Sequence, residues 1–85
     1  MTFEEAVEQE YTIFVADSHV ARRLEMKYRK NRFKSIRSIL RTDGLRKVFV
    51  DQKLYFDCYE AIEQIEMLMK GIGHVVYGSV PDVYE

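Results

Sequence analysis

The side chains best suited to covalent or metal chemistry are few and widely separated in this chain. The single cysteine, Cys58, and the two histidines, His19 and His74, lie far apart in the sequence. No two of them have the short spacing of zinc-ligand pairs, and the glycines form no phosphate-binding loop. We therefore expect no catalytic residue, no metal site and no cofactor, and we do not expect the chain to be an enzyme.

Basic side chains, in contrast, are concentrated in the middle of the chain. Twelve of the thirteen Lys and Arg residues fall within 19–56, which carries a net charge of +9, whereas 1–18 and 57–85 each carry −5. Exposed ion pairs stabilise proteins too weakly to explain such segregation, and clustered Lys and Arg are typical of surfaces that bind phosphates. The competing interpretation is a solvated face whose charges pair with the acidic flanks.

Length and composition limit the setting in which this basic segment acts. Eighty-five residues make one domain, 1–85, and 47% hydrophobic residues argue against disorder of the whole chain. No apolar run approaches the roughly 20 residues of a membrane span, and the acidic N-terminus is unlike a signal peptide. A single cysteine forms no internal disulfide, which fits a reducing, cytoplasmic location.

The N-terminal part is predicted to fold as helix, strand and helix. Thr2 and Glu5 have the spacing of a capping box. The run YTIFVA is β-branched and aromatic, as strands are. Val20, Leu24 and Tyr28 recur at the spacing of one helix face. We therefore expect a helix at 3–10, a strand at 11–16 and a helix at 19–29.

The middle segment is predicted to contain a second basic helix. Phe33, Ile36 and Leu40 repeat at helical spacing, and Gly44 follows as a typical residue just past a helix end. These features favour a helix at 33–42. A strand is the alternative, because Lys34 to Arg41 also alternates.

The C-terminal part is predicted to contain a hairpin, a helix and a short last strand. The runs LRKVFV and KLYF are strand-like, with Asp51 and Gln52 as a tight connection between them. Asp57 and Glu60 suggest a helix start, and Gly71 a helix end. We therefore expect strands at 45–50 and 53–56, a helix from about 57 to 70 and a short strand or tail at 72–85.

This element order, helix-strand-helix-helix-hairpin-helix, is that of a winged helix-turn-helix. The segment VARRL resembles its first helix, SIRSILRTDGL the end of its recognition helix, and KVFVDQKLYFDCYEAIE its wing and following helix. Over residues 20–65 the chain is similar to the excisionase and MerR-like winged-helix families, small DNA-binding proteins of phages and mobile elements. The resemblance implies an α+β winged helix-turn-helix fold whose second helix enters the major groove.

The expected function is that of a small non-catalytic DNA-binding protein: a transcription regulator, an excisionase-like factor or a phage packaging adaptor. Its partner would be double-stranded DNA, with no membrane and no small-molecule substrate. A homodimer could form through the last helix or the C-terminal strand. About five neutralised phosphates would make log K fall with log salt at a slope of about −4 to −5. The expected DNA-binding residues are Arg22, Arg23, Lys27, Arg29, Lys30, Arg32, Lys34, Arg37, Ser38, Arg41, Lys47 and Lys53.

Two other functions fit the same charge pattern. One is a protein-interaction module that inhibits or adapts a larger host machine, because alternating charge blocks can dock on a charged partner. The other is RNA binding, which the distribution of charge does not distinguish from DNA binding.

Overall fold

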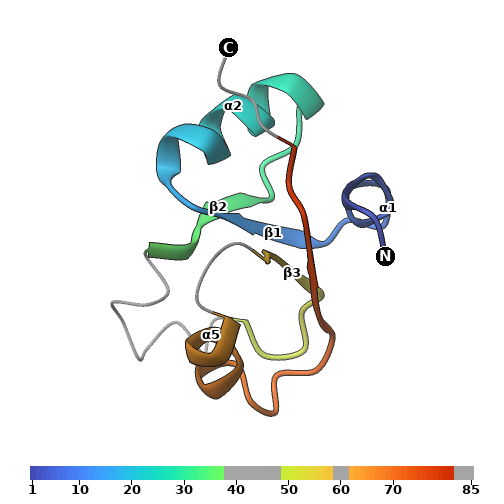
Figure 1. Ribbon diagram of the computed structural model, residues 1–85. Helices are drawn as coiled ribbons and strands as arrows, with labels where there is room; N and C mark the ends of the chain where they lie inside the picture. Colours follow the sequence, from blue (N-terminus) through green and yellow to red (C-terminus); the bar gives the residue numbers. More distant parts are fainter. Residues whose placement is uncertain (38–48, 59–61, 82–85) are drawn as a thin grey trace.

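The computed structural model describes residues 1–37, 49–58 and 62–81, and its centre is a four-stranded, all-parallel sheet (Figure 1). Neighbouring strands follow the order β2-β1-β3-β4. Strand β2 lies on one side of β1, and β3 and β4 lie on its other side. A parallel sheet that extends in both directions from its first strand is a doubly wound α/β sheet. The strands are β1 (Thr12–Val15), β2 (Phe33–Ser35), β3 (Leu54–Asp57) and β4 (Val75–Gly78).

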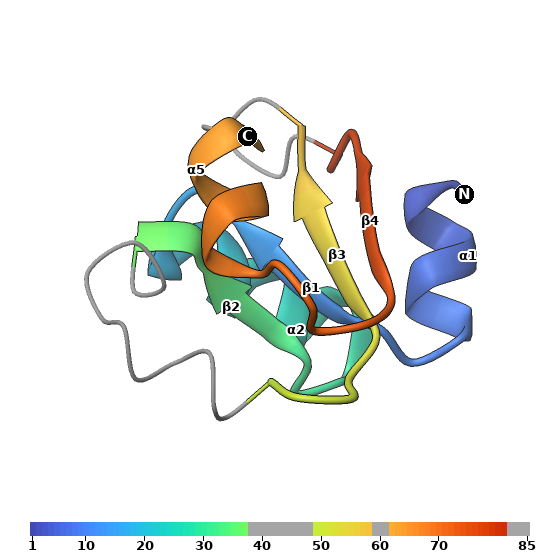
Figure 2. The same cartoon turned by 90° about the horizontal axis from the view of Figure 1, so that it is seen from below.

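Helices cover both faces of this sheet. On one face lie α1 (Phe3–Glu8) and α2 (Ser18–Tyr28), and on the other lies α5 (Ile62–Leu68) (Figures 1 and 2). Helix α2 connects β1 to β2, and α5 connects β3 to β4, so the two crossovers move in opposite directions along the sheet. Right-handed crossovers then require the helices to lie on opposite faces, as they do.

The central strands are apolar at consecutive positions because both of their faces are covered. Ile13 and Val15 of β1 belong to the cluster under α1 and α2, whereas Phe14 belongs to the cluster under α5. In β3, Tyr55 lies on the first face and Phe56 on the second. Continuous apolar runs of this kind are typical of buried parallel strands.

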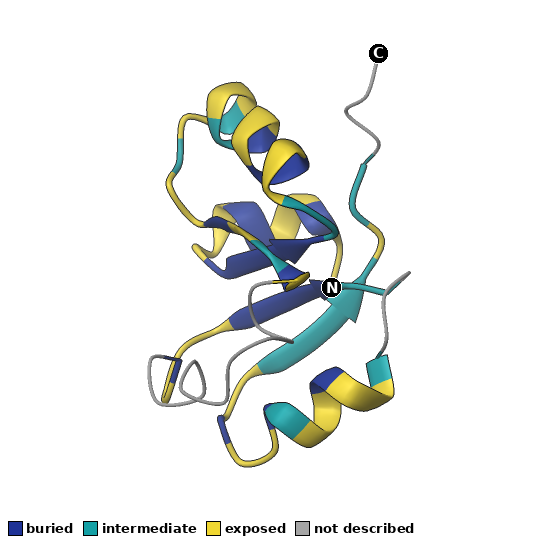
Figure 3. Cartoon of the chain, turned by 90° about the vertical axis from the view of Figure 1, so that its left-hand side faces the viewer, coloured by how far each residue is buried: buried dark blue, intermediate teal, exposed yellow. Residues whose placement is uncertain are grey.

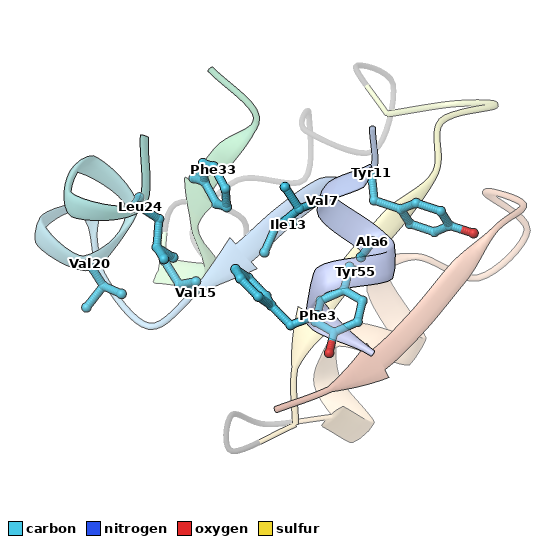
Figure 4. Packing of buried hydrophobic residues seen from close by; sticks show 11 residues of the cluster. Phe3, Ala6, Val7, Tyr11, Ile13, Val15, Val20, Leu24, Phe33 and Tyr55 are labelled. Carbon is cyan, nitrogen blue, oxygen red and sulfur yellow. The ribbon is translucent and has the colours of Figure 1, made fainter. Parts of the chain in front are cut away.

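Aromatic side chains form much of both layers of the core. On the α1 and α2 face, Phe3 contacts Tyr55 edge-on with ring centroids 6.3 Å apart (Figure 4). On the α5 face, Phe14 stacks on Phe56 at 4.7 Å, and Phe56 stacks on Tyr77 at 5.8 Å. These pairs follow the strand register, which places Phe14 opposite Phe56 and Phe56 opposite Tyr77.

Local signals determine where the helices start and end. The capping box of α1 forms as the sequence predicts, with reciprocal bonds between Thr2 and Glu5. The Asp17 carboxylate accepts a 3.0 Å hydrogen bond from the Val20 amide and caps α2. Arg29 closes α2 in the left-handed conformation, at φ +56°. Gly71, at φ +84°, follows α5 in a conformation that glycine adopts without strain.

The expectation of an α+β winged helix-turn-helix is wrong. A wing is an antiparallel hairpin, whereas every strand pair described here is parallel. The expected hairpin cannot form around 53–56, because β3 has β1 on one side and β4 on the other, both parallel to it. Phe49 to Asp51 form a turn rather than a strand, and 45–48 lie outside the described residues.

The expected recognition helix at 33–42 is also wrong at its start. Residues 33–35 form β2, which is the strand alternative for this segment. Ile36 and Arg37 are helical, as expected, and 38–42 lie outside the described residues. Pairing with β1 decides the conformation, because Phe33 sits opposite Ile13 in the buried core. The helices at 3–10 and 19–29 and the strand at 11–16 are confirmed within one or two residues at each end. The helix expected from about 57 to 70 is confirmed over Ile62–Leu68, but its expected start at Asp57 is wrong, because Asp57 ends β3; 59–61 lie outside the described residues. The last strand is confirmed over Val75–Gly78.

Candidate nucleic-acid interface

Helix α2 has one buried side and one exposed side (Figure 3), and most of the charged residues on the exposed side are cationic. Val20, Ala21 and Leu24 are buried on its sheet side. The helical repeat therefore turns Arg22 outward together with Met26, one turn later, and both are exposed. His19, Arg23 and Lys27 are exposed beside them.

The outer face of α2 also borders a broad surface hollow. It has a volume of about 660 Å³, and the side chains that line it include His19, Arg22, Arg23, Met26 and Lys27. Met26 is 76% exposed in this cationic setting. At a rise of about 1.5 Å per residue, the stretch from His19 to Lys27 extends about 12 Å, which is close to the width of the DNA major groove.

A second group of cations lies at the end of the sheet where the parallel strands begin, which we call the amino edge. The Arg32 Nη1 atom donates a 3.2 Å hydrogen bond to the Glu10 carbonyl oxygen. The Lys30 Nζ atom donates to the Val7 carbonyl oxygen at 3.1 Å, near the end of α1. The Lys53 Nζ atom lies 5.7 Å from the centre of the Tyr11 ring. Cations from distant segments thus meet at the turn between α1 and β1.

The predicted DNA-binding residues therefore divide between several places rather than forming a recognition helix and a wing. Arg22, Arg23 and Lys27 share the outer face of α2, and Arg29 follows at its end. Lys30, Arg32, Lys34 and Lys53 surround the amino edge of the sheet. Arg37 stands apart, exposed beyond the carboxyl end of β2. Ser38, Arg41 and Lys47 lie outside the described residues.

Exposure supports a surface role for most of this set. All its described members are exposed except Lys30, which is half-buried. Lys34 occupies an edge strand in the register position opposite Phe14, on the α5 side of the sheet. The described cations are thus accessible to solvent, but they do not all share one face with α2.

The carboxyl edge of the sheet gathers polar residues that sequence reasoning did not connect. Asp17 follows β1, Cys58 follows β3 and Ser79 follows β4. The Cys58 Sγ and Ser79 Oγ atoms are 3.6 Å apart, and the Cys58 amide donates to the Gly78 carbonyl at 2.9 Å. Among the described residues, no group of three or more His, Cys, Asp or Glu side chains could hold a metal ion. Only recognition of a parallel sheet would have brought these residues together in advance.

Two tyrosines, the buried Tyr55 and the half-buried Tyr77, have perturbed pKa values. Burial raises the pKa of Tyr55, and electrostatic interactions with Cys58, Asp57 and Glu4 raise it further. Burial also raises the pKa of Tyr77, with a smaller contribution from Glu66. Both phenols are therefore neutral at physiological pH, so neither is a source of negative charge near the cations.

The class defined by the fold is a doubly wound, parallel α/β domain with a cationic helix on one face. Comparison of the chain with protein-family models, with curated proteins and with solved structures finds no match in any of the three. No helix in the described part of the chain has the length and apolar character needed to cross a membrane. The geometry and charge of the surface are therefore the guide to function.

Proposed function

We propose that this chain is a small, non-catalytic DNA-binding domain that contacts backbone phosphates with the outer face of α2. The observation that carries the proposal is the division of α2 into two faces. Its apolar side chains are used for packing on the sheet, and Arg22, Arg23 and Lys27 are left in solvent on its other side. Phosphate contacts supply most of the affinity of such proteins for duplex DNA.

The proposal differs in mechanism from the winged-helix expectation. Helix α2 lies along the sheet, so its exposed side rather than its N-terminal tip is available to a groove. Contacts from this side reach the phosphates that flank a groove, and such contacts position a protein without reading sequence. We therefore expect strong salt dependence and weak sequence preference. Self-association through the edge strand β4 and a cytoplasmic location remain predictions.

A salt-titrated binding curve with a short random duplex tests the proposal. For about four phosphate contacts, the slope of log K against log salt is expected near −4. The double variant Arg22→Gln, Lys27→Gln should reduce the steepness of this slope by about 2, since each lost cation removes about one phosphate contact.

A matched control separates local contact from net charge. The double variant Glu63→Gln, Glu66→Gln changes the net charge by the same magnitude with the opposite sign, and it does so on α5, which covers the opposite face of the sheet. Its slope should stay that of the unaltered chain, because exposed charges farther apart than the Debye length of about 8 Å are largely screened. Equal slopes for the unaltered chain and the α2 variant would refute the assignment of α2. Tight binding to RNA but not DNA would favour the RNA alternative, and binding to neither at low salt would favour the protein-interaction module.

A further inference from the structure

The amino edge of the sheet contains two adjoining polar hollows. Their volumes are about 420 and 300 Å³, and both are lined by Glu10, Thr12 and Arg32. They lie where β1, β2 and β3 begin, close to the turn after α1. Lys30, Asn31 and Lys34 also line the larger hollow, and Gln9, Gln52 and Lys53 also line the smaller one.

Among the described residues, three of the cations here are held in place by neighbouring groups that leave donors unused. Arg32 uses one guanidinium N–H on the Glu10 carbonyl, and a guanidinium has five. Lys30 uses one ammonium N–H on the Val7 carbonyl, and an ammonium has three. Lys53 is placed over the Tyr11 ring by an attraction that uses no hydrogen bond. The cations are thus positioned while donors remain for a ligand.

Helix capping accounts for only part of this arrangement. The last turn of α1 contains no basic residue, so Lys30 provides the positive charge at that helix end from outside. This role does not require Lys34 or Lys53, and it does not require the hollows. Four cations surround the two hollows, and Glu10 is the one carboxylate among the described lining residues. Like charges gathered in this way repel one another, and a bound anion would relieve that repulsion.

We propose that the two hollows bind two linked phosphate groups, with Arg32 between them. A planar guanidinium presents paired N–H groups that match the oxygens of a phosphate. Lys30 and Lys34 would serve one phosphate and Lys53 the other, with the Asn31 amide as a neutral donor. The ligand chemistry is a pair of linked phosphate groups, found as the anhydride-linked phosphates of a free nucleoside diphosphate and as the successive sugar-linked phosphodiesters of a nucleic-acid strand. Only the nucleic-acid source rests on the function proposed above.

Titration of the full chain with inorganic pyrophosphate, followed by ¹H–¹⁵N NMR, tests this site. We expect saturable shifts of the Thr12, Arg32 and Lys53 amides, and binding of orthophosphate at least about tenfold weaker because it occupies one hollow at a time. Arg32→Gln should weaken pyrophosphate binding at least about tenfold. Arg22→Gln, on α2, should leave it unchanged. No saturable shift at the amino edge, or shifts confined to α2, would overturn the proposal.

A gain of affinity gives a readout that a purely structural role would not produce. Glu10→Gln removes the carboxylate that repels the ligand, and it should tighten pyrophosphate binding about threefold or more. Unchanged or weaker binding by this variant, with unaltered spectra elsewhere, would count against a phosphate in these hollows.

Separate ligands distinguish the sources and keep this proposal independent of the previous one. Shifts of the amino-edge amides by ADP but not by duplex DNA would identify a free nucleotide. Shifts by duplex DNA that Arg32→Gln abolishes would identify a strand. Pyrophosphate binding without any DNA binding would support phosphate binding in the hollows and refute the DNA proposal. DNA binding without pyrophosphate binding would support the DNA proposal and refute phosphate binding in the hollows.

Discussion

Helices α2 and α5 pack on opposite faces of one sheet and present opposite charges to solvent. Each is anchored by a fully buried aliphatic side chain, Leu24 in α2 and Ile65 in α5. Each also has a highly exposed methionine on its outer side, Met26 at 76% and Met67 at 78%. The residues around Met26 are cationic, whereas those around Met67 include Glu63 and Glu66.

The two helices show that packing on the sheet depends on the buried apolar face, whereas ligand binding depends on the charges of the exposed face. Burial of apolar side chains is non-directional and insensitive to the sign of neighbouring surface charges. The same packing therefore supports a helix that attracts phosphates and one that repels them. The DNA proposal depends on the outer faces alone, and changes on the two faces of each helix should have separable effects.

The largest expected effect is loss of stability on truncating either anchor. Leu24→Ala and Ile65→Ala should each lower the free energy of unfolding by about 2–5 kcal/mol, since each removes a fully buried side chain and leaves a cavity. Urea denaturation followed by circular dichroism measures the change. An unchanged midpoint for one variant would break the comparison, because that helix would then not be anchored in the core.

A smaller effect is expected at the start of α2. Asp17→Ala removes the cap on the Val20 amide and should cost about 1 kcal/mol of stability, whereas Asp17→Asn keeps a capping oxygen and should cost less. Because the change removes a carboxylate near the cationic helix, duplex affinity should stay the same or rise. Denaturation and fluorescence anisotropy measure the two quantities, and loss of affinity in proportion to stability would contradict their independence.

The smallest effects are expected from the buried Tyr55 and the half-buried Tyr77, which lie on opposite faces of the sheet. The Tyr55 hydroxyl donates to the Ser79 carbonyl oxygen at 3.3 Å, so Tyr55→Phe should cost about 0.5–1.5 kcal/mol. The Tyr77 hydroxyl is buried and has no hydrogen-bond partner in the described part of the chain, so Tyr77→Phe should be neutral or slightly stabilising. Urea midpoints at neutral pH compare the pair, and a larger loss from Tyr77→Phe would contradict the burial of its hydroxyl without a partner.

The same tyrosines predict the direction of an alkaline pH dependence. Both folded-state pKa values lie above the ordinary 10.0, so the unfolded chain releases these protons first as pH rises. The contribution of the two pKa shifts to the free energy of unfolding is therefore fully present below about pH 10. It is lost above about pH 10, as pH approaches the folded-state pKa values. Urea midpoints between about pH 8 and 11 should fall less steeply in the double variant Tyr55→Phe, Tyr77→Phe, and identical slopes would contradict the pKa shifts.

The sequence predicted local elements better than their arrangement. Capping signals at Thr2 and Asp17 and the periodicity of Val20 and Leu24 are contained within a few residues, and the helices that they predict are present. Phe33 to Ser35 was assigned to a helix because its apolar spacing extends to Leu40, but pairing with β1 overrides that preference. The consecutive apolar residues at 13–16 and 54–56 did contain the signal of strands buried on both faces.

The sequence identifies the cations of the candidate site, but it does not show which of them lie together in space. Arg22 and Lys27 could be assigned to an outer helix face directly from periodicity. The meeting of Arg32 with Lys53 depends on β2 and β3 lying on either side of β1, and no local pattern encodes it.

By itself, the sequence determined the segregation of charge, the capped helices and the alternation of apolar residues between two core faces, because each of these follows from neighbours along the chain. The tertiary structure decided that the strands are parallel, that α2 and α5 lie on opposite faces, and that cations from separate segments surround the hollows at the amino edge. These features depend on pairing between residues distant in sequence, where burial of both sheet faces outweighs local preference.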